Sequence, residues 1–515
     1  MEEEVFVRAV RGTGVLSGQS VINTFLDLAL FMFFARIVSR YEMGVYGAVL
    51  LVYMVLAILG SLGLSFAASH FLPHFYGKNE YRKVKSTVER ILTITLVSAF
   101  IFCLVQIVFA SFLSDLLFGT SVHAHLFWLT GLGTFAAILG TVSCGFVSGL
   151  QKFGSLALFR FLSQVVRVSI TVWLLLLGFG VASIFLGWIV FFSALAGLAL
   201  FLTIREVLGV RMEGDLNLNN GSLQFKVLLG FSLPMLVYQF VSFLSDSVDR
   251  FIVLGFLGTA PLGVYTVALT VTNSIIMIFG YPLLITLVPG MSEAEAKIGV
   301  ESVSNSFRLV SRYVSLIFIP ICFGIAVLSP LVVNVLAGLK YVEAAFPLSI
   351  VCFGLSIYGF SVGLISVLTA LGKTLRVAVA VLLASSIGLS LSLLFVPVFG
   401  VLGAAISRAV MYISMFGLLF YLASRIIHPS FDKQAIWKSC VASVVMVFTV
   451  FYLAYLTGYV LTLLPLYLFV SLTVYGIMLM VLRFPTAQDA RFLVKIIPQS
   501  EKLVDKIKKF IKSHV

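Results

Sequence analysis

The chain has 515 residues, of which 61% are hydrophobic and 11% are charged. Soluble domains carry about 25% charged residues, so this composition excludes an ordinary soluble enzyme and also a disordered chain. The net charge of +13 does not indicate nucleic-acid binding, because the basic residues stand in short gaps between apolar runs rather than on one polar face. The remaining environment is a lipid bilayer.

Fourteen apolar runs are long enough to cross a membrane as helices, each of which needs about 20 residues. Because backbone in the hydrocarbon core must be hydrogen-bonded within its own segment, the sequence predicts an all-α integral membrane fold. No cleavable signal peptide is expected, because the start Met1–Glu4 is acidic. The runs centre near Asp27, Leu56, Ile101, Ala136, Ile170, Ser193, Phe243, Asn273, Ile321, Ser356, Ser386, Tyr412, Val447 and Val470.

The basic residues test this count of spans. With the N-terminus inside, all but six of the 34 Lys and Arg residues fall in cytoplasmic segments or the tail. The six exceptions are Arg36, Arg40 and Lys340 in external segments and Arg167, Arg250 and Arg408 within spans. This asymmetry follows the positive-inside rule. We therefore expect a multi-pass protein of the cell membrane with both termini in the cytoplasm.

Metal and cofactor chemistry is not indicated. The five cysteines lie inside apolar runs and form no CxxC pair. The histidine pairs His70 with His74 and His123 with His125 stand near span ends without thiol ligands, so we interpret them as interfacial residues rather than as metal ligands. No metal site and no cofactor are expected.

The chain repeats itself. Gly44–Tyr46 returns as Gly263–Tyr265, and Asp27 stands as far before the first motif as Asp246 stands before the second. Such a collinear series indicates a duplicated unit. Because each predicted unit holds six spans, the two copies enter the membrane in the same direction and are expected to be related by a pseudo-two-fold axis along the membrane normal.

The repeat divides the chain into five predicted segments. These are an N-terminal six-helix lobe (8–205), a cytoplasmic linker (206–224), a C-terminal six-helix lobe (225–425), two additional transmembrane helices (436–483) and a basic amphipathic cytoplasmic tail (486–515). The tail places apolar residues on one helical face with lysines around the rest, which is typical of a helix lying on an anionic leaflet.

Polar residues inside the predicted spans need a reason, because a charge at mid-membrane costs about 2.5–3.5 kcal/mol on insertion scales. Two matched stripes stand out, Ser20, Asn23 and Asp27 in the first span and Gln239, Ser242 and Asp246 in the seventh. Facing helices with such stripes would line a wet cavity, so we predict Asn23 and Gln239 as substrate-binding residues. Asp27 and Asp246 either bind a coupling proton or cation, or only hold the arginines in place.

Three intramembrane arginines complete the predicted site. Arg167 shares a helical face with Gln164, Arg250 follows Asp249, and Arg408 lies in the twelfth span. The planar, two-donor guanidinium suits phosphate, so this group predicts an anionic ligand. Asp246 stands four residues before Arg250 and is placed to pair with it. In the alternative interpretation this pair neutralises itself and only locks helix packing.

Several segments resemble one transporter family. Asp249–Gly258, followed by Gly263–Tyr265, resembles the start of the second half in polysaccharide exporters of the multidrug/oligosaccharidyl-lipid/polysaccharide superfamily. Phe71–Pro73 is similar to the end of the second span in that group, and Gly372–Lys373 with Gly403–Ala405 looks like its eleventh and twelfth spans. The order of these motifs is more specific than any one of them, and the resemblance covers about residues 8–425.

The resemblance implies a flippase for lipid-linked oligosaccharide of the O-antigen translocase type. It implies two lobes around a cationic cavity that holds the glycan and its phosphate, while the polyprenyl tail stays among the membrane lipids. It also implies alternating access coupled to a proton or Na⁺, with Asp27 as a candidate because an acidic residue on the first helix has that role in drug-exporting relatives.

Three alternatives remain open from the sequence. A cation-coupled multidrug antiporter of the same fold would have a mainly acidic cavity, which the three intramembrane arginines disfavour. A membrane enzyme such as a glycan polymerase would need acid and base residues in a sizeable outer loop, and the outer segments are short. A scramblase or assembly subunit is not excluded by any pattern.

Overall fold

The computed structural model describes residues 2–78, 80–208 and 225–484, and this part of the chain contains helices and turns but no strand. Fourteen segments in it are long and apolar enough to cross a membrane. The predicted all-α fold with fourteen spans is therefore confirmed, and the chain is a multi-pass membrane protein. The predicted tail, 486–515, and most of the predicted linker, 209–224, lie outside the described residues.

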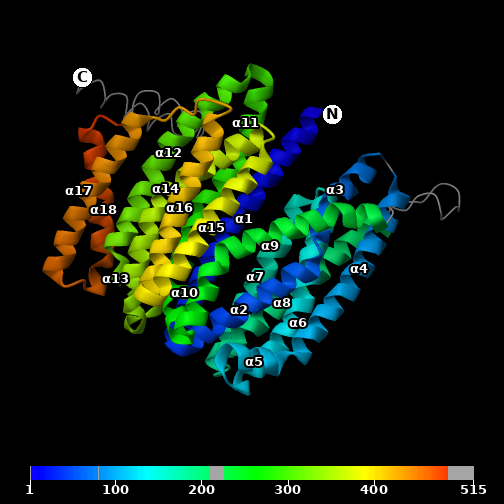
Figure 1. Ribbon diagram of the computed structural model, residues 1–515. Helices are drawn as coiled ribbons and strands as arrows, with labels where there is room; N and C mark the ends of the chain where they lie inside the picture. The colour runs from blue at the N-terminus through cyan, green and yellow to red at the C-terminus, as the bar shows by residue number, and fades with distance from the viewer. Residues whose placement is uncertain (1, 79, 209–224, 485–515) are drawn as a thin grey trace.

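Eight α-helices precede the linker and are called the N-lobe (Figure 1). They are α1 (Glu2–Ile37), α2 (Arg40–Ser61), α3 (Leu64–Gly77), α4 (Tyr81–Val108), α5 (Ala110–Phe118), α6 (Ala124–Gly149), α7 (Phe153–Leu176) and α8 (Val181–Leu208). Helices α2 and α3 form one broken span, and the 3₁₀ turn η1 (Ser121–His123) leads into α6.

Eight more α-helices follow the linker and are called the C-lobe. They are α9 (Phe225–Leu257), α10 (Thr259–Ile275), α11 (Tyr281–Ile298), α12 (Val300–Val327), α13 (Ser329–Ala337), α14 (Ala345–Ala370), α15 (Thr374–Phe399) and α16 (Val401–Ser424). A π-helical turn, η2 (Ile276–Gly280), joins α10 to α11, and the 3₁₀ turn η3 (Leu339–Ala344) leads into α14.

The second span breaks where it meets the C-lobe. Leu62 and Gly63 both adopt left-handed backbone conformations, with φ of 49° and 67°. A Cβ added at Gly63 would overlap the main-chain oxygen of Ser232 on α9. Next to this contact, His70 of α3 stacks on Phe231 of α9, with ring centroids 4.4 Å apart. The break therefore lets the first half of α9 lie against the N-lobe.

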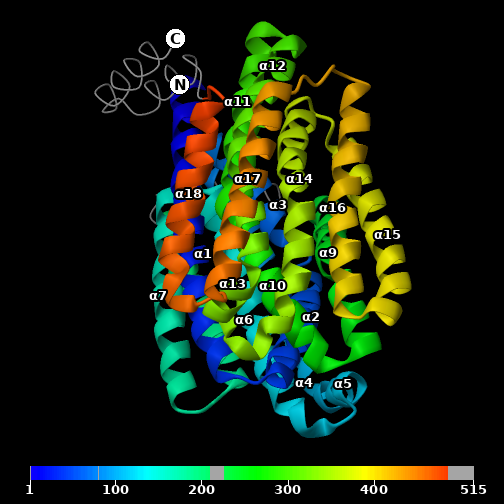
Figure 2. The same cartoon turned by 90° about the vertical axis from the view of Figure 1, so that its left-hand side faces the viewer.

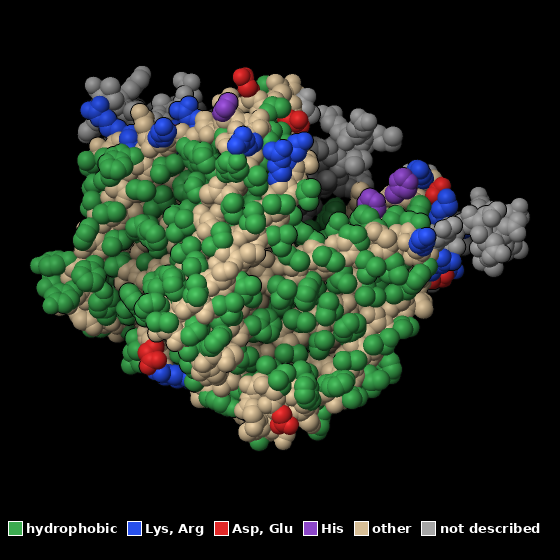
Figure 3. Space-filling view, in the orientation of Figure 1, with side chains coloured by type: hydrophobic (Ala, Val, Ile, Leu, Met, Phe, Trp, Pro, Cys, Tyr) green, Lys and Arg blue, Asp and Glu red, His purple; other side chains and the backbone are tan. Residues whose placement is uncertain are grey.

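The described charges separate toward the two ends of the helix bundle. Lys and Arg side chains gather at the end where α1 begins, which is here called the basic end, while the middle of the surface is apolar (Figure 3). Arg36, Arg40 and Lys340 lie instead at the opposite end, where Arg36 contacts Val335 of α13 and Arg40 contacts Lys340. This separation is what the positive-inside pattern of the sequence requires.

The lobes diverge toward the basic end and meet at the opposite end, where α2 crosses α10 (Figure 1). A Cβ added at Gly44 would overlap the main-chain oxygen of Thr259, and one added at Gly263 would overlap that of Arg40. Both glycines open the repeated motif, and Arg40 corresponds to Thr259 in the same register. Each lobe thus offers an equivalent glycine to the other, as a two-fold relation produces.

Polar contacts at the end opposite the basic end also join the lobes, and we call them the latch. Arg40 Nη1 lies 2.9 Å from Glu343 Oε1, and Arg40 Nε donates to the main-chain oxygen of Lys340. Lys340 Nζ donates to the main-chain oxygen of Arg36 at 3.0 Å, and Arg36 Nη2 donates to that of Val335 at 2.9 Å. The last turns of α1 and α13 are therefore each capped by a basic side chain of the other lobe.

Two further spans, α17 (Lys433–Thr457) and α18 (Leu464–Val481, preceded by the 3₁₀ turn η4, Leu461–Leu463), pack beside the C-lobe (Figure 2). They are held to α12. A buried ion pair joins Arg312 Nη1 to Asp432 Oδ2 at 3.2 Å, and Ser439 Oγ donates to the main-chain oxygen of Ser315 at 2.6 Å. These contacts join the pair to the C-lobe.

Candidate functional site

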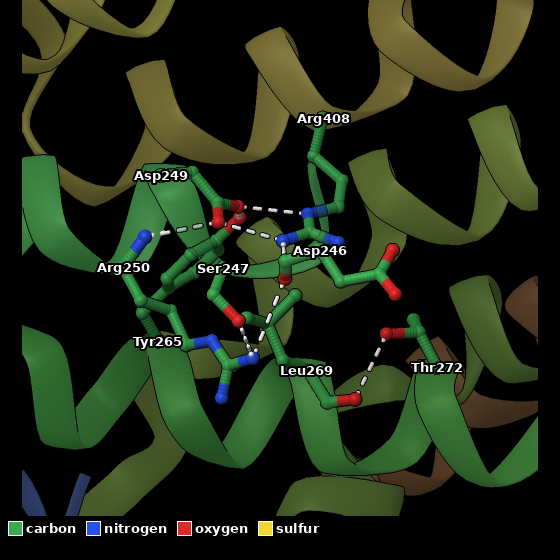
Figure 4. Close-up of polar contacts among 8 residues, drawn as sticks. All are labelled: Asp246, Ser247, Asp249, Arg250, Tyr265, Leu269, Thr272 and Arg408. Carbon is green, nitrogen blue, oxygen red and sulfur yellow. Dashed lines mark hydrogen bonds and ion pairs between the residues drawn. The ribbon is translucent and has the colours of Figure 1, made fainter. Parts of the chain in front are cut away.

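The C-lobe holds an ion pair that is almost fully enclosed. Arg408 of α16 donates to both carboxylate oxygens of Asp249 of α9, from Nη2 at 2.6 Å and from Nε at 2.7 Å, and Tyr265 donates its hydroxyl to the same carboxylate (Figure 4). Only 3% of the Arg408 side chain and 6% of the Asp249 side chain are exposed. This two-pronged pair ties three helices of one lobe together and leaves neither charge available to a ligand.

Arg250, next on α9, has a different environment (Figure 4). Its Nη2 donates to Ser247 Oγ at 2.7 Å and to the main-chain oxygen of Asp246 at 3.3 Å. Its Nε is buried and has no hydrogen-bond partner among the described residues, where no carboxylate lies within ion-pair distance of the guanidinium. Intramembrane charges normally have partners. The Arg250 guanidinium departs from this rule, because it keeps donors that no described residue uses.

The predicted pair of Asp246 with Arg250 is wrong. The Asp246 carboxylate is exposed, forms no hydrogen bond within the described part of the chain and points away from Arg250 (Figure 4). Only its main-chain oxygen is used, by Arg408 Nη2 at 2.7 Å and by Arg250. Helical spacing places the two side chains on one face, but Arg250 Nη2 donates instead to Ser247 Oγ and to the main-chain oxygen of Asp246.

The N-lobe holds a second, more open ion pair. Arg167 Nη2 of α7 lies 2.5 Å from Asp27 Oδ1 of α1, and Gln164 Nε2 donates to the same oxygen at 2.9 Å. The Arg167 guanidinium lies over the Trp188 ring at 4.0 Å, a cation–π contact. The Arg167 side chain is only 6% exposed, whereas that of Asp27 is 46% exposed. The carboxylate is therefore the accessible partner, and the arginine is neutralised.

The two clusters lie near the same region of the lobe junction. Tyr46 of α2 is close enough to Arg167, Asp27 and Arg250 for each charge to act on it. Asn23 lies one turn before Asp27, and its Oδ1 is buried without a hydrogen-bond partner in the described chain. Gln239 lies earlier on α9 than either acid and forms no hydrogen bond to a described residue. Neither amide joins a cluster.

Sequence reasoning missed two aromatic members of these clusters, Trp188 and Tyr265. A signal was present for both. Tyr265 ends the repeated motif, and Trp188 occupies the register of Arg408 when Phe179–Val181 is aligned with Phe399–Val401. In the N-lobe this position on the last helix contacts the arginine of an arginine–aspartate pair, and in the C-lobe it is the arginine of such a pair.

In the described part of the chain, no group of three or more His, Cys, Asp or Glu side chains is placed to hold an ion. What the junction offers is one under-used guanidinium, Arg250, and two accessible carboxylates, Asp27 and Asp246. These groups suit the binding of an anion together with a proton or a small cation.

Comparison with known proteins gives one family and several relatives. The family described as polysaccharide biosynthesis protein matches residues 33–346. An uncharacterized membrane protein of Methanocaldococcus jannaschii is 22% identical over 420 residues, which cover 77% of this chain and 80% of that protein. Stage V sporulation protein B of Bacillus subtilis is 26% identical over 305 residues, which cover 55% of this chain and 58% of that protein.

Solved structures share the fold. An inward closed conformation of the lipid II flippase MurJ superposes with a TM-score of 0.71 at 17% identity and covers 90% of this chain and 97% of that one. An inward-facing multidrug resistance MATE family transporter of the MOP superfamily superposes with a TM-score of 0.64 at 14% identity, covering 80% and 97%. The chain therefore shares its fold with these flippase and transporter structures, as the resemblance of the sequence motifs implied.

Proposed function

The chain belongs to the polysaccharide biosynthesis protein family, and from this membership we propose that it is a flippase that moves lipid-linked oligosaccharide from the cytoplasmic to the outer leaflet. The likeness of its fold to MurJ and MATE transporters supports a transport role rather than an enzymatic one. The carrier lipid would be of the polyprenyl-phosphate type. The proposed product supplies polysaccharide or glycoconjugate synthesis.

The observation that carries the proposal is the state of Arg250. Its guanidinium is held on α9 by Ser247 and a main-chain oxygen, but its Nε is buried and unused in the described chain. A phosphate oxygen would fill those donors with short, charge-assisted hydrogen bonds. Arg408 and Arg167 are already neutralised by Asp249 and Asp27, so their proposed role is to shape the site rather than to bind phosphate.

The proposed transport cycle is alternating access between the two lobes. We take the basic end as cytoplasmic in the cell membrane, because the positive-inside rule places Lys and Arg there. With the latch closed at the outer end, the lobes diverge toward the cytoplasm (Figure 1). Substrate would enter from that side with its glycan between the lobes and its polyprenyl chain in the lipid.

Asp27 and Asp246 are the proposed coupling carboxylates. Both are accessible, and Asp27 shares one oxygen with Arg167 and Gln164. A proton or Na⁺ at Asp27 would weaken its attraction for Arg167 and so change the energy of the N-lobe cluster. A bound ion shifts the equilibrium between two arrangements of the lobes only if it binds one of them more tightly. In the proposed cycle, Asp27 and Asp246 supply this difference in affinity.

A cation-coupled antiporter is the second candidate function. The accessible carboxylates of Asp27 and Asp246 are the observation that favours it, since an organic cation would bind to them. The unpaired Arg250, about one helical turn from Asp246, disfavours it because it would repel such a cation.

Ligand-induced stabilisation of the purified full chain tests the proposal. A ligand that binds the folded state raises its thermal midpoint with concentration. We expect undecaprenyl-diphosphate-linked sugar to stabilise the wild type and the control Lys373→Gln, an exposed residue at the basic end, but Arg250→Gln much less. Stabilisation by tetraphenylphosphonium alone would overturn the proposal and support the antiporter.

A further inference from the structure

A pocket of about 430 Å³ lies at the latch. Its walls are mostly apolar and include Pro261 of α10, Phe346 of α14, Phe399 of α15 and Leu402 of α16, and the Arg40–Glu343 ion pair of the latch also lines it. Its size lies in the range of small-molecule sites. Because Arg40 belongs to the N-lobe and the other residues to the C-lobe, an occupant would contact both lobes.

The charges beside this pocket are unusual for their position. Arg36, Arg40 and Lys340 are the three basic residues that the sequence places in external segments, and the structure gathers all of them at the latch. Topology disfavours basic residues on that side of a membrane. A cluster of three of them therefore indicates a local requirement for positive charge.

Arg36 and Lys340 already have structural partners, because they cap the helix ends of the opposite lobe. Arg40 is less committed. Its Nη2 has no hydrogen-bond partner among the described residues, and its ion pair with Glu343 is open to solvent, with 37% and 65% of the two side chains exposed. Exposed pairs contribute little stability, so an anion that reaches Arg40 competes with a weakly held carboxylate.

The apolar wall suggests what accompanies the anion. Phe346 and Phe399 line the pocket and are 63% and 55% exposed. Such surfaces bind hydrocarbon chains, and Arg binds phosphate oxygens in the fork geometry. A phosphate and an apolar chain in one molecule fit the guanidinium and the wall together.

We propose that the latch pocket is a second binding site, which takes a lipid phosphate from the leaflet at the latch end, with the phosphate on Arg40 and the start of the apolar chain against Phe346, Phe399 and Leu402. The ligand bridges the two lobes only while the latch is closed, so its binding favours that arrangement. The site does not depend on the proposed transport of oligosaccharide, because phospholipid alone supplies the required chemistry.

Two substitutions separate ligand binding from simple loss of the latch. Arg40→Gln and Glu343→Gln each remove the same ion pair, but only Arg40→Gln removes the phosphate-binding cation. The thermal midpoint of the purified full chain would be followed against phosphatidylglycerol, undecaprenyl phosphate and, as the control that lacks a phosphate, diacylglycerol. Leu402→Trp fills the pocket without changing a charge.

We expect phosphatidylglycerol to stabilise the wild type and Glu343→Gln, with Glu343→Gln responding at lower lipid concentration because the competing carboxylate is gone. Arg40→Gln should need about tenfold more lipid or not respond, the loss expected for one charged hydrogen bond, and Leu402→Trp should not respond. A response to undecaprenyl phosphate but not to phosphatidylglycerol would assign the site to the carrier lipid.

Three results would overturn the inference. These are equal changes in Arg40→Gln and Glu343→Gln, an equal response to diacylglycerol, and an unchanged response in Leu402→Trp. Arg250→Gln should keep the phosphatidylglycerol response whether or not the proposed flippase function is correct, so failure of one proposal is distinguishable from failure of the other.

Discussion

Arg250 and Arg408 belong to the same lobe and differ in their partners. Arg408 gives two donors to Asp249 and is 3% exposed, whereas Arg250 binds only a hydroxyl and a main-chain oxygen in the described chain. Removing one member of a buried pair leaves the other charge uncompensated, while removing an unpaired charge does not. Arg408 therefore contributes to stability, and Arg250 is free to serve a ligand.

This contrast predicts opposite consequences for two matched variants. Arg408→Gln should lower the free energy of unfolding by about 3–5 kcal/mol, because it leaves Asp249 buried without its cation. Arg250→Gln should change it by less than about 1 kcal/mol or raise it, because an unsatisfied charge is removed. Reversible unfolding of both variants in mixed micelles measures the difference, and equal destabilisation would contradict the assignment of roles.

The site was predictable from the sequence only in part, and the reason lies in particular residues. The intramembrane charges themselves were visible, because a charge in an apolar run stands out. Their partners were not: Asp27 pairs with a residue of α7 and Asp249 with one of α16, and no spacing within one helix encodes a contact between helices. Spacing within α9 instead suggested Asp246 with Arg250, which the structure does not form.

At the scale of helices, the crossing of α2 and α10 depends on two glycines. The repeated motif revealed Gly44 and Gly263 but not their purpose, which is to let each backbone approach the other lobe. The polar edge of this crossing, Arg40 with Glu343, is exposed. Close packing of α2 on α10 is therefore expected to contribute more to lobe closure than the ion pair does.

Enlarging one glycine tests this expectation. Gly44→Ala should destabilise the closed arrangement by about 1–3 kcal/mol, the usual range for overpacking, because its new methyl group meets the main-chain oxygen of Thr259. Gly255→Ala is the matched control, since a Cβ there meets nothing within 4 Å. Labelling of a cysteine placed at Val38, which is buried in the closed arrangement, by a membrane-impermeant thiol reagent should speed up in Gly44→Ala alone, and unchanged labelling would refute the role of the crossing.

The attachment of α17 and α18 is a second feature at this scale. Asp432 caps the start of α17 by accepting from the Ala435 N–H at 3.0 Å, and it also pairs with Arg312 of α12. One carboxylate thus supports both the helix end and the contact with the C-lobe.

Replacing that carboxylate should loosen both spans. Asp432→Asn is expected to cost about 1.5–3 kcal/mol, because it removes the charge-assisted hydrogen bond to Arg312 and weakens the cap of α17, and to expose the connection before α17 to protease. Glu293→Gln removes an exposed pair with Lys297 and should cost less than about 1 kcal/mol. Limited proteolysis should cleave Asp432→Asn before α17 faster than it cleaves Glu293→Gln. Similar cleavage of both variants would show that packing of apolar surfaces holds α17 in place.

For the whole molecule, the sequence predicted more than it did for the site. Hydropathy alone indicates the fourteen spans, because the thickness of the bilayer dictates the length of each helix. The helix break at Leu62 and Gly63 was not predicted, and neither was the contact of the first half of α9 with the N-lobe. Both arise where the lobes touch. The assignment of segments to domains stays a prediction, including the basic tail beyond the described residues.

The lobes diverge at the basic end and are joined by the closed latch at the other end. This arrangement fits a transporter that opens to one side at a time. We propose that such a movement carries a lipid-linked oligosaccharide and that Arg250 binds its phosphate. Two observations support this proposal, the family to which the chain belongs and the unused donors of the Arg250 guanidinium.

The most direct test measures flipping itself, in proteoliposomes loaded with a fluorescent lipid-linked oligosaccharide whose outer-leaflet fraction is read with an impermeant quencher. The account predicts flipping by the wild type and the control Lys373→Gln, and a rate about tenfold to a hundredfold lower for Arg250→Gln, the loss expected for a charged hydrogen bond. A wild-type rate in Arg250→Gln, or no flipping by the wild type above protein-free vesicles, would contradict it.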